Sequence, residues 1–277
     1  MYNYILLRYG EIFLKGRNRG DFVNKLIGNI KRISGKNVKK LHNRLYLDHF
    51  EGHSVLKKVF GLLSYSPCIK LGESWDVEVE EIKEGILRLM KSEKGTFKVE
   101  TKRSDKRFLV KSPDLNRILG EYLESETELE FDFKSPGLVV GVEINQSGVF
   151  LYKEKISCFG GLPVGSGEKV MLLLEGEESV LSGLLMMKRG CELGVVSFEG
   201  RGIGLLQEFS PKKIGFDLVK DYGEIGEIMK RENCLALTVG ETLDNFDDKD
   251  FGVVVYRPLI AYTNEDIKKE LKEYKDE

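Results

Sequence analysis

The stretch KVMLLLEGEESVLSGLLMMKRGCELGVVSF, residues 169–198, joins two short apolar runs through a turn and a helical segment. MLLLE and GVVSF are runs of the kind found in buried parallel strands. SVLSGLLMMKRG between them has the length of a connecting helix. A strand, a tight turn and a helix in this order form a frame that suits phosphate binding at the start of the helix. The stretch therefore predicts an α/β fold with a parallel sheet.

The same alternation continues to the end of the chain. CLALTVG and FGVVVYRPLI are two further apolar runs, and EIGEIMKREN and NEDIKKELKEYKDE have helical patterns. Alternating strands and helices indicate a doubly wound parallel sheet. SCFGGLPVGSGEK interrupts every periodicity with glycine and proline and predicts a linker in front of it. We assign residues 163–277 to this shortened α/β domain.

Two smaller domains are predicted before the linker. In residues 1–70, YNYILLRY predicts a strand, and Gly16 and Gly20 bracket a basic turn. DFVNKLIGNIKRI predicts a helix, VKKLHN and RLYLDHF a hairpin, HSVLKKVFGL a second helix and LSYSPCIKL a last strand. This β-α-β-β-α-β order is the ferredoxin-like arrangement.

Residues 71–162 predict a mixed α/β unit. WDVEVEEIKEGILRLMKS predicts one helix, and a second is expected to begin with Ser112 as N-cap and Pro113 in the first turn. TFKVETKRS, ELEFDF, LVVGVEIN and GVFLYKEKI predict strands.

Composition excludes several classes of protein. The 277 residues are 41% hydrophobic and 32% charged, with no apolar run near the roughly 20 residues that span a bilayer. The amino end makes a poor secretory signal. The four cysteines lie far apart without a CxxC pair or a histidine cluster, so we expect no metal site and a reducing, cytoplasmic compartment.

Charge is distributed unevenly along the chain. Residues 1–68 carry a net charge of +9, residues 69–165 carry −3 and residues 166–277 carry −8. A basic first quarter on an acidic chain indicates a surface for a polyanion, and nucleic acid is the expected ligand. The alternative is an ordinary solvated surface. The RNA-binding residues predicted from the basic clusters are Arg8, Lys15, Arg17, Arg19, Lys25, Lys102, Arg103, Lys106 and Arg107.

Seven segments in the same order resemble one known family. RYGEIFLKGRNRGDFVNKLIGNIKR, FKVETKRSDKRF, SPDLNRILGEYL, LVVGVEINQSGVFLYKEKI, GGLPVG, LLMMKRGCE and VGETL with YRPLI are similar to segments of the tRNA 4-thiouridine synthetases, the ThiI sulfurtransferases also tied to thiamine biosynthesis. The resemblance implies a ferredoxin-like domain, a tRNA-binding THUMP domain and a PP-loop domain that adenylates a base with ATP. It also implies that the first two domains recognise the acceptor region of tRNA.

The sequence departs from the family at the phosphate loop. Family members carry Ser-Gly-Gly-x-Asp-Ser, whereas the aligned residues 174–179 read Leu-Glu-Gly-Glu-Glu-Ser. Only Gly176 and Ser179 are retained, and Glu178 takes the position of the Asp. Gly176, Glu178 and Ser179 are therefore the predicted cofactor-binding positions, in a degenerate ATP loop that we expect to be inactive.

Electrostatics support that expectation. A phosphate loop needs glycine and free backbone N–H groups. Glu175, Glu177 and Glu178 place carboxylates there instead. Near 4 Å and an effective dielectric of about 20, each pair of like unit charges costs about 4 kcal/mol. A typical ATP affinity is only about −6 to −8 kcal/mol. As an alternative role, acidic residues in a first helical turn stabilise the helix by roughly 0.3–1 kcal/mol each.

No catalytic residue is predicted. The family's catalytic cysteines lie beyond the stretch that matches YRPLI, where this sequence ends, and neither Cys191 nor Cys234 matches them. After VGETL, the family's amides near the active site are replaced by the acidic residues 244–248, DNFDD.

The leading hypothesis is a tRNA-binding relative of the 4-thiouridine synthetases without its own adenylation or sulfur transfer, acting beside another modifying enzyme or a sulfur donor protein. It needs no cofactor. A first alternative is an ATP-dependent tRNA thiolation enzyme with a variant loop, which would use ATP with Mg²⁺. A second is a dimerisation or protein-docking module, since basic and acidic halves can attract each other in a homodimer.

Overall fold

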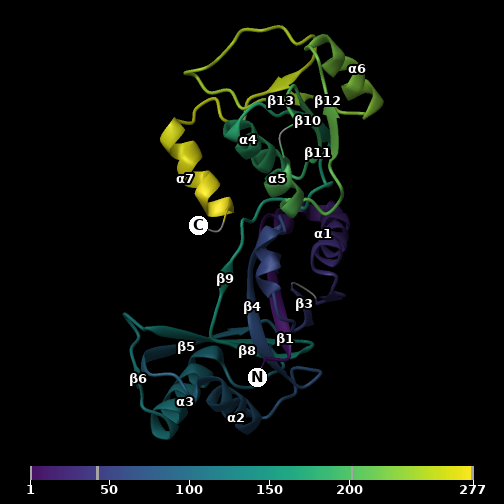
Figure 1. Cartoon of the computed structure of the whole chain (residues 1–277). Coiled ribbons are helices and arrows are strands. Elements are labelled where there is room, and N and C mark those ends of the chain that lie inside the picture. The colour runs from purple at the N-terminus through teal and green to yellow at the C-terminus, as the bar shows by residue number, and fades with distance from the viewer. Residues whose placement is uncertain (1, 42–43, 201, 276–277) are drawn as a thin grey trace. The chain divides into compact units, whose positions relative to one another are not determined.

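The computed structural model describes residues 2–41, 44–200 and 202–275 (Figure 1). Their contacts divide the chain into two compact units. Unit 1 comprises the residues up to Arg8, Lys36–His53 and Ser64–Ser157. Unit 2 comprises Tyr9–Gly35, Ser54–Leu63 and the residues from Cys158 onward. The two units are therefore interleaved along the sequence.

The amino-terminal strands have the order expected of a ferredoxin-like sheet. They are β1 (Tyr4–Tyr9), β2 (Lys39–Lys40), β3 (Leu45–Asp48) and β4 (Leu62–Leu71). Their spatial order is β2-β3-β1-β4, and β3 pairs antiparallel with both β1 and β2. The predicted hairpin is confirmed, and residues 42–43 of its turn lie outside the described residues.

The helical segments of this fold differ from the prediction in two places. They are η1 (Glu11–Asn18), α1 (Arg19–Ser34) and η2 (His53–Lys58). The second predicted helix is only a short 3-10 segment, because Gly61 turns the chain with a φ of +101° and β4 begins at Leu62. The basic turn is also helical: Gly16 lies in η1 with a φ of +52°, and Gly20 lies inside α1.

The second set of strands continues the first sheet. Its elements are α2 (Val79–Met90), β5 (Gly95–Arg103), α3 (Ser112–Glu126), β6 (Leu129–Phe131), β7 (Leu138–Asn145), β8 (Gly148–Tyr152) and β9 (Ile156–Ser157). β4 pairs with β8, and the order runs on as β8-β7-β5-β6. Helices α2 and α3 cover one face of these strands (Figure 1). The N-cap of α3 is Lys111 rather than Ser112, which is the first helical residue.

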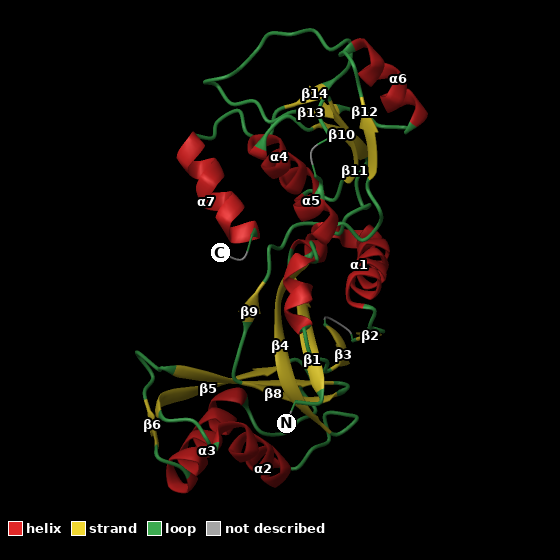
Figure 2. Cartoon of the chain, viewed as in Figure 1, coloured by secondary structure: helices red, strands yellow, loops and turns green. Residues whose placement is uncertain are grey.

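The carboxyl-terminal domain is a doubly wound α/β fold, as the sequence predicts. Five parallel strands have the order β12-β11-β10-β13-β14 (Figure 2). Helices α4, α5 and α7 pack on one face and α6 on the other. Helix α5 and strand β12 are not in the sequence-based prediction. The elements are β10 (Lys169–Leu173), α4 (Glu177–Lys188), β11 (Glu192–Ser197), α5 (Gly204–Phe209), β12 (Gly215–Leu218), α6 (Gly223–Arg231), β13 (Leu237–Thr238), β14 (Val255–Tyr256) and α7 (Asn264–Tyr274).

Within unit 2, an aromatic cluster joins this domain to the segment around η2. Phe60 stacks on Phe209 with ring centroids 5.2 Å apart, and Phe159 stacks on Tyr274 at 4.3 Å. Helix α1 contributes Asn29, whose amide donates to the Val164 carbonyl oxygen at 2.9 Å. These buried contacts explain why residues from both ends of the chain form one unit.

Candidate RNA surface and nucleotide pocket

A pocket of about 290 Å³ lies at the start of α4, between the carboxyl ends of β10 and β13. The strand order reverses direction between these two strands, because the chain moves outward from β10 first to β11 and later to β13. Open α/β sheets bind their ligands at such a switch point. The predicted ATP positions Gly176, Glu178 and Ser179 all line this pocket.

Carboxylates dominate the pocket. Glu175, Glu178, Glu241 and Asp247 line it, and Lys249 is the one cation among the described lining residues. The Lys249 ammonium lies 3.1 Å from the centroid of the Tyr222 ring. Partial burial and the neighbouring Glu241 raise the pKa of Glu175, against the opposing effect of Lys249. Glu241 is thus close enough to disfavour the charged form of Glu175.

One backbone N–H group just before α4 already has a partner. The Glu175 N–H donates to the Ser179 hydroxyl at 3.2 Å. Gly240 lies so close to this helix end that a Cβ built on it would be 2.6 Å from the Ser179 backbone nitrogen. Glu177 and Glu178 occupy the first turn, as predicted for residues that stabilise the positive end of the helix.

One predicted group of RNA-binding residues lies on η1 and α1 in unit 2. Arg17 is exposed, and Lys15 is half-buried with its ammonium 5.0 Å from the Phe22 ring centroid. The Arg19 guanidinium lies over Phe13 at 4.4 Å and donates to the Tyr9 hydroxyl at 3.2 Å. Lys25 is half-buried on α1.

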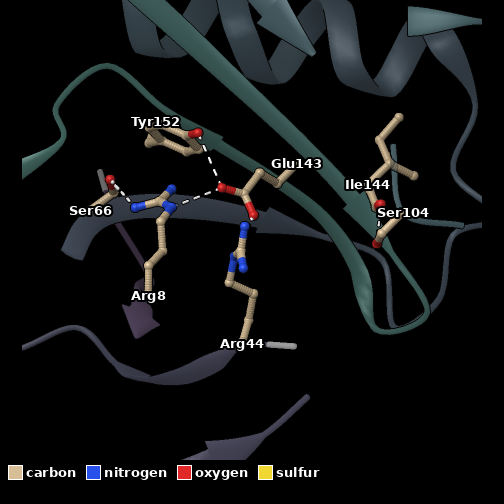
Figure 3. A network of polar contacts seen from close by, with 7 residues as sticks. All are labelled: Arg8, Arg44, Ser66, Ser104, Glu143, Ile144 and Tyr152. Atoms are coloured by element: carbon tan, nitrogen blue, oxygen red, sulfur yellow. Dashed lines mark hydrogen bonds and ion pairs between the residues drawn. The ribbon is translucent and has the colours of Figure 1, made fainter. Parts of the chain in front are cut away.

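Arg8 differs from the other predicted cations because it lies in the interior of unit 1. Its guanidinium donates to Glu143 Oε1 and to the Ser66 hydroxyl, both at 2.9 Å, and only 6% of its side chain is exposed (Figure 3). This placement argues against Arg8 as an RNA contact. The order β1-β4-β8-β7 brings Arg8 and Glu143 together, and that order is not readable from local sequence patterns.

The second predicted group surrounds the loop between β5 and α3 in unit 1. Lys102, Lys106 and Arg107 are exposed. Arg107 pairs with the buried Asp105 at 2.6 Å. Arg103 has a structural contact, because it donates to the carbonyl oxygens of Phe108 and Val110 at 2.7 and 3.0 Å. Arg103 therefore anchors the loop that presents its neighbours.

Sequence reasoning missed two cations of unit 1, Lys40 and Arg44. They flank the turn of the β2–β3 hairpin and line the same cavity as Lys102. Their spacing on either side of the hairpin turn was the available signal. To see that these two cations lie beside Lys102, one must know that the sheet of the hairpin pairs with the later strands.

The thiols are poor nucleophiles. Burial raises the pKa of Cys158 to about 12, and it also raises the pKa of Cys191 and Cys234. Since the thiolate is the reactive form, burial lowers the reactivity of these side chains. Among residues 2–41, 44–200 and 202–275, no group of three or more His, Cys, Asp or Glu could hold a metal ion. Over the same residues, no helix is long and apolar enough to cross a membrane.

Two family models match the first half of the chain. Residues 4–66 match the ThiI ferredoxin-like domain, and residues 77–154 match the THUMP domain.

Curated relatives extend the match into the α/β domain. Probable tRNA sulfurtransferases from Alkaliphilus metalliredigens and Acetivibrio thermocellus are 39% and 40% identical over 214 and 212 residues. These alignments cover 72% and 70% of this chain and 53% of each relative. The chain thus spans about half the length of the curated relatives that it matches.

Solved structures are similar over nearly the whole chain. The crystal structure of PH1313 from Pyrococcus horikoshii superposes with a TM-score of 0.86 at 27% identity, covering 99% of this chain and all of that one. A 4-thiouridine synthetase in complex with RNA and bound ATP gives a TM-score of 0.81 at 27% identity, covering 99% of this chain and 85% of that one.

Proposed function

We propose that this relative of the tRNA sulfurtransferases, with its ThiI ferredoxin-like and THUMP domains, binds tRNA and has no ATP-dependent adenylation or sulfur transfer of its own. The two matched domains make up the first half of the chain. One observation carries the proposal: a chain that superposes on an RNA-bound 4-thiouridine synthetase has carboxylates at the nucleotide pocket.

The pocket at α4 supports the loss of nucleotide chemistry. A triphosphate would meet the carboxylates of Glu175 and Glu178, and that of Glu241, which pairs with Arg257 at 2.6 Å, in a site with a single lysine among its described lining residues. It would also compete with Ser179 for the Glu175 N–H. These carboxylates do not fit the polyphosphate of ATP, which is bound through N–H groups and positive charge.

The exposed cations support RNA binding. Arg17 on η1 and Lys102 and Lys106 around the β5–α3 loop offer their charges at the surface of their units, and Arg107 beside them is exposed but paired with Asp105. Basic side chains at a protein surface bind the RNA backbone through its phosphates. We include the acceptor region of tRNA as the target because the family resemblance implies it.

A second candidate is an ATP-dependent tRNA thiolation enzyme with a variant loop. The observation that favours it is the preserved frame: Gly176 and Ser179 still stand at the start of α4, and the helix has no side-chain N-cap. The two functions differ in one measurable step, which is the release of pyrophosphate from ATP.

The test combines two assays on the full chain. We expect fluorescence anisotropy to show binding of an unmodified tRNA transcript, and a coupled assay to show no pyrophosphate release from Mg·ATP with that tRNA. A 4-thiouridine synthetase serves as the positive control. Pyrophosphate release that depends on tRNA would establish the second candidate, and absence of tRNA binding would refute the proposal.

A further inference from the structure

A groove of about 480 Å³ lies in unit 1, between helix α3 and the edge strand β6 of the sheet (Figure 1). Among the described residues, it shares none of its lining with the cavity that contains Lys102. Strand β5 contributes Val99 to the groove, α3 contributes Gly120, and the chain at and after the end of β6 contributes Phe131 and Phe133. The volume is within the range of about 300–1,000 Å³ that is usual for binding pockets, so the groove can receive several side chains of a ligand.

Exposed aromatic rings form one wall of the groove. Phe133 is 76% exposed and Phe131 is 47% exposed. The Phe131 ring lies edge-on to the buried Phe97, with ring centroids 6.1 Å apart, so its position is fixed. On the facing helix, Gly120 leaves the groove open, because a Cβ built on it would already lie 3.7 Å from the Phe131 ring. Large apolar side chains exposed beside a concave surface indicate a site of interaction with another molecule.

The groove also contains an unpaired strand edge. β6 pairs with β5 only as far as Phe97, whereas β5 continues beyond it. The Phe97 carbonyl oxygen accepts an N–H from the residue after β6 at 2.9 Å, and the Thr101 N–H donates to the Asn116 side chain of α3 at 2.9 Å. Because alternate residues of a strand direct their N–H and C=O groups to the same side, the Val99 backbone between them also faces this side. No strand among the described residues lies opposite Val99 there, and such an edge can pair with an added strand.

The charge around the groove is negative. Both cations among its described lining residues are already paired with lining carboxylates. The pairs are Lys98 with Glu100 at 2.8 Å and Arg117 with Glu121 at 3.1 Å. Glu124 also lines the groove and forms no ion pair with the described residues. Residues 121–132 contain six Asp or Glu and no Lys or Arg. This surface therefore attracts a cationic ligand and repels the phosphates of RNA.

We propose that this groove binds an extended, basic and apolar segment of a partner protein, which adds as a strand to the free edge of β5. The backbone of the segment would pair with β5 at Val99, its apolar side chains would pack on Phe131 and Phe133, and its Lys or Arg side chains would meet Glu124. In strand addition, main-chain hydrogen bonds provide affinity and pockets for alternate side chains provide specificity. Docking at this groove does not require that the chain binds tRNA, and it adds a protein partner to the proposed function.

The experiment titrates the full chain into fluorescently labelled synthetic peptides and follows their anisotropy. The probe is an amidated heptapeptide that alternates lysine with valine or isoleucine, as a strand with one basic and one apolar face does. One control peptide has glutamate in place of every lysine. A second control peptide keeps the lysines but has proline at its centre, which removes a backbone N–H and disfavours strand pairing.

Two variants of the groove are compared with matched controls. Phe133→Ser removes the exposed ring, and Leu109→Ser is its control at a side chain that is 91% exposed and does not line the groove. Glu124→Gln removes a charge but keeps an oxygen for the Phe131 N–H, from which Glu124 accepts at 2.9 Å. Its control is Glu84→Gln, at an exposed glutamate of α2 outside the groove. Circular dichroism verifies that each variant is folded.

We expect the unmodified chain to bind the lysine peptide saturably, and Phe133→Ser to weaken that binding by about tenfold, as the loss of an aromatic anchor does. Glu124→Gln should weaken it by about two- to fivefold, because one partly solvated charge is lost. Leu109→Ser and Glu84→Gln should bind the peptide as the unmodified chain does. The glutamate and proline peptides should both bind far more weakly than the lysine peptide. All four variants should bind tRNA with unchanged affinity.

Several results would overturn the docking site. One is the absence of saturable binding of the lysine peptide, and another is binding that neither groove variant weakens, which would indicate a general attraction to acidic surfaces. Equal affinity for the proline peptide would overturn strand addition. Weaker tRNA binding by Phe133→Ser, together with competition between tRNA and the peptide, would assign the groove to RNA instead. Failure of the unmodified chain to bind tRNA would refute the proposed function alone, because the peptide titration does not depend on it.

Discussion

Glu143 is a single carboxylate on which two arginines depend. Arg8 approaches it from β1 and Arg44 from the position just before β3, and Arg8 is almost fully buried. Removing one partner of a buried ion pair leaves an uncompensated charge in the interior, which is strongly destabilising. Glu143 thereby links the hairpin sheet to the strands of the THUMP fold.

We predict that Glu143→Gln lowers the free energy of unfolding by about 3–5 kcal/mol. Chemical denaturation followed by circular dichroism measures the change. Glu130→Gln, at an exposed glutamate of β6, is the control and should stay within about 0.5 kcal/mol of the unmodified chain. A cost below 1 kcal/mol for Glu143→Gln would mean that the network contributes little.

The same residue predicts an acid limb in the stability profile. Burial alone would raise the pKa of Glu143, but the charges and hydrogen bonds of Arg8 and Arg44 hold it below the ordinary value of 4.5. Its stabilisation is therefore present above about pH 4.5 and is lost as the pH falls through the lower folded-state pKa. Unfolding titrations from about pH 6 to pH 3 should show a steeper loss for the unmodified chain than for Glu143→Gln. Parallel curves would contradict this assignment.

Gly240 marks a close approach that only glycine allows. Its position against the start of α4 leaves no room for a methyl group, since the contact would be with the Ser179 backbone. We predict that Gly240→Ala destabilises the chain by about 1–3 kcal/mol in thermal or chemical unfolding. Gly226→Ala is the matched control: it lies inside α6 with nothing within 4 Å, and should stabilise by up to about 1 kcal/mol. Equal effects of both changes would contradict the packing argument.

The conformation of the loop between β5 and α3 is held by the side chain of Arg103, the last residue of β5. Arg103 binds two carbonyl oxygens of the loop, whereas Lys102 points its charge at the cavity of unit 1. Hydrogen exchange followed by mass spectrometry should show faster exchange over residues 104–111 in Arg103→Ala and no change in Lys102→Ala. An unaltered loop in Arg103→Ala would return Arg103 to the set of candidate RNA contacts.

Local sequence patterns predict most helices and strands correctly. They fail where adjacent parts of the chain determine the length of an element. The apolar runs from Lys169 to Ser197 predict β10, α4 and β11 because buried parallel strands have a distinctive composition. The segment after Glu51 has helical spacing but forms only η2, because the turn at Gly61 and the start of β4 limit its length. α5 and β12 are short, with six and four residues, and were not predicted.

The candidate sites likewise include residues that local sequence predicts and residues that only the fold brings together. The substitutions at residues 174–179 predict an acidic pocket directly, since they lie within one loop. The burial of Arg8, the contribution of Glu241 and the cavity lined by Lys40 and Arg44 all depend on strand order across long sequence separations. No window of sequence contains that information.

For the molecule as a whole, the separation of charge along the chain predicts that the affinity for RNA depends strongly on salt concentration. A net charge of +9 in the first 68 residues stands against −8 in the last 112. We predict that tRNA affinity falls at least a hundredfold between about 50 and 200 mM salt, as several phosphate contacts are lost to counterions. Anisotropy titrations measure the slope. Affinity that is insensitive to salt would favour the protein-docking alternative.

The central claim, RNA binding without nucleotide chemistry, is tested most directly by calorimetric titration of Mg·ATP into the full chain in the presence of saturating tRNA. The carboxylates around α4 predict no saturable heat up to millimolar ATP. Saturable binding at micromolar or tighter affinity would contradict the account, because it would require the pocket of Glu175, Glu178 and Glu241 to accept a triphosphate.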